Sequence, residues 1–160
     1  MGVSGCGKTQ VGQRFAKAIG AGFIDGDDLH PKENVAKMAR GEPLDDADRK
    51  PWLAAVALQL AQADGPLVIG CSALRRRYRD WIRDGAPGPV TFLHLAGTRE
   101  VIAGRMAERT DHFMPLSLLD SQFAALEPPD HDESAVTVDI DQSIAEIVDD
   151  LIAQVASHDT

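Results

Sequence analysis

A glycine-rich stretch at the start of the chain constrains the fold more than any other feature. Residues 2–9 have the sequence GVSGCGKT, which matches the pattern G-x-x-x-x-G-K-[ST] at every fixed position. Glycines let successive backbone N–H groups turn inward around phosphate oxygens, where a Cβ atom would block the approach. We expect Lys8 to reach the phosphates and Thr9 to offer its hydroxyl to Mg²⁺; the alternative is a glycine-rich turn with a solvated lysine. The predicted nucleotide-binding residues of this loop are Gly2, Val3, Ser4, Gly5, Cys6, Gly7, Lys8 and Thr9.

The residues before this loop present a problem. A phosphate-binding loop of this kind follows a buried strand, yet only Met1 precedes Gly2. The missing strand would be the first and central one of the sheet. We expect the natural chain to start upstream, with Met1 as the last residue of that strand; the alternative is a sheet with an unfilled position.

The rest of the chain alternates short apolar runs with helical patterns, which is typical of an α/β fold around a parallel sheet. We therefore predict a three-layer P-loop fold, with the sheet flanked by helices and all 160 residues in one domain. Strands are expected at residues 22–25, 67–71, 90–95 and 135–140. Helices are expected at residues 8–19, 31–40, 51–63, 72–84, 99–109, 116–126 and 143–155.

Composition and charge exclude several classes of function. Lys and Arg number 16 against 25 Asp and Glu, a net charge of −9, which disfavours binding to nucleic acid or to anionic membranes. The longest apolar-rich run, residues 53–63, is too short to span a bilayer, and the first residues lack the pattern of a signal peptide, so we expect none. Cys6 and Cys71 lie far apart, which indicates neither a disulfide framework nor a zinc site. We expect a reduced, cytoplasmic protein.

Five further segments identify a family resemblance. They are GDDLHPKENVAKMARGEPLDDADRKPWL at 26–53, CSALRRRYRD at 71–80, the segment 109–115 ending in HFMP, SQFAALEPP at 121–129 and VDIDQS at 138–143. Together with the glycine loop they resemble the gluconate kinases, P-loop small-molecule kinases, over essentially the whole chain. The resemblance implies phosphorylation of D-gluconate to 6-phosphogluconate by ATP and Mg²⁺, and it suggests a homodimer. The alternatives are a kinase of another hydroxy acid such as shikimate, or a catalytically impaired nucleotide-binding relative.

Acidic residues lie at the end of the predicted strand at residues 22–25 and just after it. Asp25 and Asp27 are two residues apart, so strand alternation points both carboxylates to one side, at the sheet edge where the glycine loop holds phosphate. Similarity to related kinases assigns Asp25 to the outer shell of the metal, and Asp27 to the substrate as the base that accepts its proton. The alternative is that these are loop carboxylates that cap the helix near Pro31, and Asp28 is the residue most readily explained in that way.

The resemblance places the substrate against a segment at about residues 26–53. Arg49 offers a planar guanidinium for two-point binding of a carboxylate, unless it is a surface arginine paired with nearby aspartates. His30 is expected to be a hydrogen-bonding residue of this segment rather than a catalyst. Arg75 and Arg79 share a helix face and are assigned to the substrate. Ser72 either hydrogen-bonds a substrate hydroxyl or caps the helix that follows.

Two more segments complete the predicted site. Arg105 and Arg109 lie four apart on a helix that leads into a lid at about residues 105–116, and lid arginines can neutralise charge on the transferring phosphoryl group. Asp141 and Gln142 follow the last strand, where the resembling kinases contact adenine through the backbone. Cys6 stands where this family commonly has serine; we expect a small, tolerated loop residue, and the alternative is a reactive thiol beside Lys8.

Overall fold

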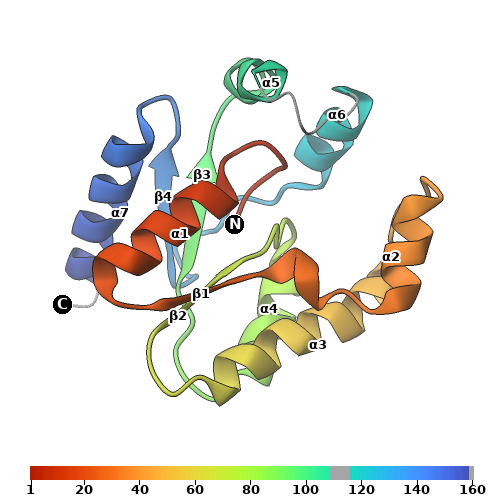
Figure 1. Ribbon diagram of the computed structural model, residues 1–160, viewed down its shortest axis with the longest axis horizontal. Helices are drawn as coiled ribbons and strands as arrows, with labels where there is room; N and C mark the ends of the chain where they lie inside the picture. Colours follow the sequence, from red (N-terminus) through yellow and green to blue (C-terminus); the bar gives the residue numbers. More distant parts are fainter. Residues whose placement is uncertain (109–115, 159–160) are drawn as a thin grey trace.

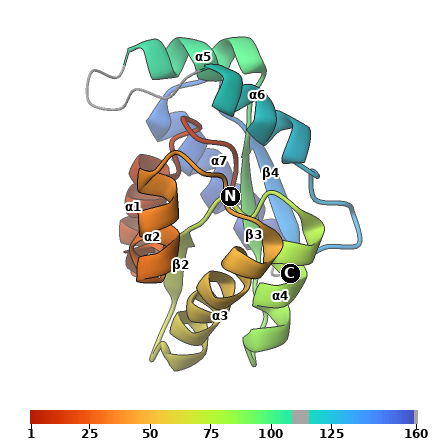
Figure 2. The same ribbon diagram turned by 90° about the vertical axis from the view of Figure 1, so that its right-hand side faces the viewer.

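The computed structural model describes residues 1–108 and 116–158, and these form a layered α/β structure (Figure 1). Parallel strands lie at the centre, and helices cover both sides (Figure 2). In chain order the elements are α1 (Lys8–Ile19), β1 (Gly22–Asp25), the 3₁₀ helix η1 (Gly26–Leu29), α2 (Lys32–Ala39), α3 (Asp46–Gln62), β2 (Leu67–Gly70), α4 (Arg76–Gly85), β3 (Phe92–Ala96), α5 (Arg99–Ala107), α6 (Leu116–Ala125), β4 (Ala135–Asp139) and α7 (Ile144–His158). The predicted fold class is confirmed.

The four strands form two parallel pairs. β1 pairs with β2 from Gly22 opposite Leu67, and β3 pairs with β4 from Phe92 opposite Ala135. Helices α1 and α7 pack together beside the strands, and α3 packs on α4. One apolar core lies under α1, β3, β4 and α7, and a second lies around α3 and α4. Parallel strands carry their C-terminal ends to the same edge, so the loops after β1, β2 and β4 gather near the glycine loop.

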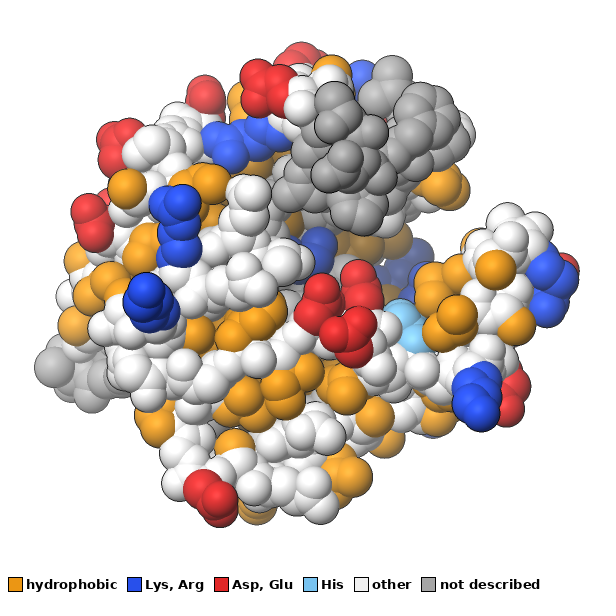
Figure 3. Space-filling model, in the orientation of Figure 1, with side chains coloured by type: hydrophobic (Ala, Val, Ile, Leu, Met, Phe, Trp, Pro, Cys, Tyr) orange, Lys and Arg blue, Asp and Glu red, His pale blue; other side chains and the backbone are white. Residues whose placement is uncertain are grey.

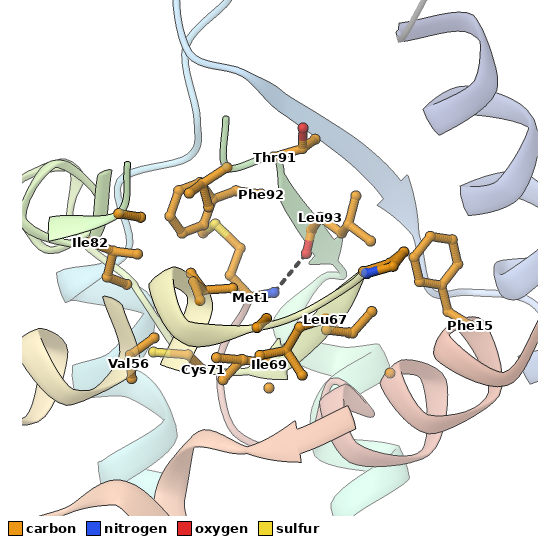
Figure 4. Close-up of a pocket in the computed structure, with 18 of the residues that line it drawn as sticks. Met1, Phe15, Val56, Leu67, Ile69, Cys71, Ile82, Thr91, Phe92 and Leu93 are labelled. Carbon is orange, nitrogen blue, oxygen red and sulfur yellow. Dashed lines mark hydrogen bonds between the residues drawn. The ribbon is translucent and has the colours of Figure 1, made fainter. Parts of the chain in front are cut away.

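Met1 lies between the two strand pairs. Its amino group donates to the carbonyl of Leu93 at 2.6 Å, and its carbonyl accepts from the N–H of Leu95 at 3.0 Å, as in a parallel β-bridge (Figure 4). On the other side, the N–H of Gly2 donates to the carbonyl of Ser72 at 3.2 Å. Met1 therefore occupies the end of a central strand position, as the sequence predicts. Along the rest of that position, an apolar cavity of about 530 Å³ separates β2 from β3 in the described part of the chain.

Helix α3 begins five residues before the predicted start. Asp45 caps the helix by accepting from the N–H of Asp48 at 2.8 Å, and the Asp48 carboxylate accepts from the N–H of Asp45 at 3.0 Å. This reciprocal capping box satisfies two N–H groups that a helix terminus would otherwise leave unpaired. Pro51, which we predicted as the first helical residue, therefore lies inside α3.

Helix α4 begins four residues after the predicted start. Its N-cap is Arg75, so the prediction that Ser72 caps this helix is wrong. The reason is Ala73, which has a φ of 45° and thus a left-handed backbone that cannot continue from Ser72 into a right-handed helix. Residues 71–75 instead form a connection between β2 and α4 that passes beside the glycine loop.

Candidate active site

The glycine loop is shaped around the ammonium group of Lys8. Gly5 and Gly7 have φ values of 84° and 96°, which residues with a Cβ rarely adopt. The Nζ of Lys8 donates to the carbonyls of Gly2 at 3.0 Å and Val3 at 3.2 Å, so the positive charge lies within the bend at the start of α1. The loop thus combines inward-turning backbone, a cation and a helix N-terminus, which together suit a phosphate chain.

Two side chains fix this loop from behind. The Cys6 thiol is 0% exposed in the main core, and a Cβ built on Gly2 would lie 2.7 Å from its sulfur. Cys6 therefore serves as a small packing residue, as expected, and not as an accessible thiol. Gln122 of α6 accepts from the N–H of Ser4 at 2.6 Å and donates to the Ser4 hydroxyl at 3.0 Å. Sequence reasoning missed Gln122, because its partner Ser4 lies 118 residues away in the chain. The one available signal was that Gln122 lies in the segment 121–129, which resembles the gluconate kinases.

The acidic residues after β1 lie beside Lys8, as predicted. The Asp25 carboxylate accepts from the N–H of Asp27 at 3.0 Å, which caps η1 and fixes the turn. Asp27 is exposed in this turn, but partial desolvation of its carboxylate raises its pKa, the negative charge of Asp25 raises it further, and the positive charge of Lys8 opposes both. A carboxylate with a raised pKa is a stronger base, so Asp27 is suited to accept a proton. Asp28 is also exposed in the same turn.

His30 and Arg49 extend the site away from the glycine loop. The His30 ring stacks on the buried Trp52 with centroids 4.1 Å apart. Burial lowers the pKa of His30, the negative charge of Asp27 opposes this, and the positive charge of Arg49 adds to it, so the three groups are neighbours. Arg49 donates to the carbonyl of Leu44 at 2.6 Å. Figure 3 shows acidic side chains and a histidine at the edge of a hollow between α2 and the rest of the molecule.

The loop after β2 brings further groups to this region. The carbonyl of Ser72 accepts from the N–H of Gly2, which ties this loop to the glycine loop. Arg75 is half-buried at the start of α4. A hydrogen bond from Tyr78 lowers the pKa of Asp46, and the nearby positive charges of Arg49 and Arg75 lower it further. Arg49 of α3 and Arg75 at the start of α4 thus lie near the same carboxylate, and the carbonyl of Ser72 lies against the glycine loop.

Arg79 does not belong to this site, and its assignment to the substrate is corrected. Its guanidinium is 0% exposed and contacts both oxygens of the Glu133 carboxylate, at 2.8 and 3.0 Å. It also donates to the carbonyls of Ala73 at 2.9 Å and Glu127 at 2.8 Å. The hydrogen bonds from Arg79, together with one from Arg83 at 2.8 Å, lower the pKa of Glu133 to about 2. Arg79 therefore joins the loop before α4 to the loop before β4 inside the protein.

Arg105 and the loop after β4 are linked. The Arg105 guanidinium donates to the carbonyl of Gln142 at 2.9 Å and to that of Ile140. The N–H of Asp141 donates to the Asp139 carboxylate at 2.9 Å, which closes the turn. Arg105 thus supports the segment predicted to lie against adenine. Arg109 and residues 110–115 of the predicted lid lie outside the described residues.

Oxygen ligands for a metal are few here. Within residues 1–108 and 116–158, no group of three or more His, Cys, Asp or Glu side chains comes together as a metal site. Thr9, exposed at the start of α1, and Asp25, at the end of β1, offer a hydroxyl and a carboxylate. This sparse set of hard oxygen donors fits a cation such as Mg²⁺, which keeps several waters and binds substrate phosphates.

Comparison with known proteins decides the family. The family described as "AAA domain" matches residues 1–129. The thermosensitive gluconokinase of Escherichia coli strain K12 is 48% identical over 155 residues, covering 93% of this chain and 81% of that protein. The gluconokinase of Gluconobacter oxydans strain 621H is 42% identical over 162 residues, covering 99% and 90%. The chain belongs to the gluconokinase family.

A solved structure supports the same conclusion. The crystal structure of a gluconokinase from Sinorhizobium meliloti 1021 is 51% identical in sequence and superposes with a TM-score of 0.91, covering 98% of this chain and 89% of that one. The fold of this gluconokinase family member is thus shared along nearly its whole length. No helix in the described ranges is long and apolar enough to cross a membrane.

Proposed function

We propose that this chain transfers the γ-phosphoryl group of ATP to the terminal hydroxyl of D-gluconate, giving ADP and 6-phosphogluconate. The observation that carries the proposal is the pairing of Lys8, enclosed by the glycine loop, with Asp27, whose pKa is raised, at the adjacent strand end. One group holds a phosphate chain and the other activates an alcohol. The gluconokinase relatives name the alcohol.

Catalysis rests on positioning and on neutralising charge. The loop backbone and Lys8 hold the phosphates of ATP. The hydroxyl oxygen of the substrate forms a bond to the γ-phosphorus as the bond to the ADP oxygen breaks, and Asp27 takes the hydroxyl proton. Mg²⁺, held through Thr9 and with Asp25 in its outer shell, would reduce the negative charge of the phosphates. Arg109 would assist at the transferring group, and Arg105, which donates to the carbonyls of Ile140 and Gln142, would position the loop that faces adenine.

The sugar acid would bind along residues 26–53. Arg49 is suited to its carboxylate, because a guanidinium can make two parallel hydrogen bonds to the two oxygens. His30, Ser72 and Arg75 would contact the remaining polar atoms. The backbone at Asp141 and Gln142 would face adenine. All these groups belong to one domain, residues 1–160.

The setting of the enzyme follows from its charge and family. We propose a cytoplasmic protein. Its net charge of −9 would repel the phosphates of nucleic acid, so we also propose that it does not bind nucleic acid. A homodimer is the proposed assembly, and light scattering on the purified protein would measure its mass directly.

A coupled ADP-release assay across several acids tests the proposed function. We expect turnover with D-gluconate, little with shikimate or other sugar acids, and none after a chelator removes divalent metal; adding Mg²⁺ back should restore the rate. Turnover with another acid in place of gluconate would show a kinase of different specificity. Binding of ATP with no turnover of any acid would show a catalytically impaired relative.

A further inference from the structure

Asn34 is a buried polar residue on an otherwise exposed helix. Its side chain is 3% exposed, and it is the only buried residue of α2, all of which lies in the described part of the chain. A buried amide is costly unless its hydrogen-bonding groups are paired. The Nδ2 of Asn34 lies 2.9 Å from the carbonyl oxygen of Asp48 and 3.2 Å from the Nδ1 of His30.

These two contacts fix the protonation of His30. A carbonyl oxygen can only accept, so the NH₂ of Asn34, and not its oxygen, must face Asp48. The second hydrogen of the same NH₂ then points to His30 Nδ1, which must accept it. The neutral ring therefore carries its proton on Nε2. The partner carbonyl is itself held, because Asp48 belongs to the capping box of α3 and its carboxylate pairs with Lys37 at 2.6 Å.

The orientation of the His30 ring is fixed as well. It stacks on Trp52 with an interplanar angle of 18°, and the Trp52 Nε1–H donates to the carbonyl of Gly26 at 2.8 Å. Two charged groups face this ring: Asp27 from η1 and Arg49 from α3. Both groups belong to the proposed substrate site. The stacking on Trp52 therefore fixes the orientation of the His30 ring in that site, and the contact with Asn34 fixes its tautomer.

We propose that Asn34 is a positioning residue that holds His30 as the Nε2–H tautomer, so that this N–H donates to a hydroxyl oxygen of the polyhydroxy acid beside Asp27. The inference rests on the proposed function. It adds Asn34 to the residues of the site and makes His30 the hydrogen-bond donor to the substrate. Asn34 itself does not contact the substrate. Protonation of His30 would place an Nδ1–H against the Asn34 NH₂, two donors facing each other, so acid conditions oppose this arrangement.

The chain allows a matched set of variants. Asn34→Ala removes the constraint, and His30→Gln replaces the ring by an amide that can donate from a similar position without a tautomer. The exposed neighbour Val35 provides the control Val35→Ala on the same helix. Asn34→Ala should raise the KM for gluconate about tenfold, as expected for a lost hydrogen bond, with the KM for ATP changed less than about twofold. In the His30→Gln background, Asn34→Ala should raise the KM for gluconate by much less.

Two readouts separate this role from simple stability. Nitrogen-15 NMR of the wild-type protein should show His30 as the Nε2–H tautomer, and in Asn34→Ala the Nδ1–H form should become populated. The acid limb of kcat/KM for gluconate should move to higher pH in Asn34→Ala. An Nδ1–H tautomer in the wild type, or an unchanged KM for gluconate in folded Asn34→Ala, would overturn the proposal. Absence of gluconate turnover in the wild type would instead refute the proposed function, while the NMR result would still test the tautomer.

Discussion

The buried pair of Arg79 and Glu133 provides a quantitative test of the corrected assignment. Glu133→Gln keeps the size of the side chain but leaves a buried guanidinium without its anion. Breaking a buried pair in this way costs about 3–5 kcal/mol. Arg79, Arg83 and the backbone N–H of Asp130 together lower the Glu133 pKa from 4.5 to about 2, which corresponds to about 3 kcal/mol for all of these contacts. We therefore expect the free energy of unfolding to fall by at least about 3 kcal/mol.

Urea unfolding followed by circular dichroism measures this loss. With a urea m-value of about 2 kcal/mol/M, the midpoint should fall by about 1.5 M. The matched control is Asp132→Asn, because Asp132 makes a two-point pair with Arg76 at 2.9 Å but the two side chains are 58% and 40% exposed. Loss of this exposed pair should cost less than about 1 kcal/mol. Replacing both buried partners, as Arg79→Met with Glu133→Leu, should cost less than Glu133→Gln alone.

The pair also predicts a pH signature and a kinetic result. The folded pKa of Glu133 is depressed, so its contribution to stability is complete above about pH 4.5 and is lost as the pH falls toward 2. Glu133→Gln should lack this loss of stability between pH 4.5 and 2. At a temperature where Glu133→Gln is folded, its KM for gluconate should match that of the wild type. A variant that is as stable as the wild type but binds gluconate tenfold less tightly would refute the structural role and return Arg79 to the substrate site.

Three other predictions concern stability and reactivity. Burial lowers the pKa of His94 from 6.5 to about 4, so stability should fall by about 3 kcal/mol as the pH drops from 6.5 toward 4, and His94→Leu should flatten this part of a urea-midpoint profile. Gly26→Ala would place a Cβ 2.4 Å from a backbone oxygen of β2 and should cost about 2–3 kcal/mol by the same assay, whereas Gly65→Ala, with open space around it, should change stability by less than about 0.5 kcal/mol; equal effects would contradict the packing described. Both cysteine thiols are buried, so iodoacetamide should leave Cys6 and Cys71 unmodified in the native enzyme and alkylate them in urea, as followed by mass spectrometry; rapid alkylation of Cys6 with loss of activity would show an accessible thiol.

Local patterns in the sequence predicted most of the elements. The helix at 8–19 and the strand at 22–25 have the bounds that we expected, because both are set by neighbouring residues: a glycine before and after the helix, and a short apolar run. The start of α3 was missed because we took Pro51 as the first helical residue, whereas Asp45 caps the helix together with Asp48. The start of α4 was missed because nothing in the sequence marks Ala73 as left-handed.

The site residues also fall into two groups, those that local sequence patterns predicted and those that depend on contacts between distant elements. Lys8 and Asp27 were predictable because a short motif and strand alternation place them relative to one another. Arg79 was misplaced because the position of an arginine on a helix does not show whether its face points inward. Its partner Glu133 lies 54 residues away, and the contact exists only once α4 and the loop before β4 have packed. Gln122 and Asn34 were missed for the same reason, since each acts through a partner on another element.

The turnover and ATP affinity of Asp27→Asn test the central claim most directly. If the glycine loop holds the nucleotide and Asp27 activates the alcohol, the variant should bind ATP within about threefold of the wild type while kcat with gluconate falls by about 100-fold or more. The exposed neighbour provides the control, because Asp28→Asn should keep kcat within about threefold. A kcat for Asp27→Asn close to that of the wild type, with ATP bound normally, would contradict the account.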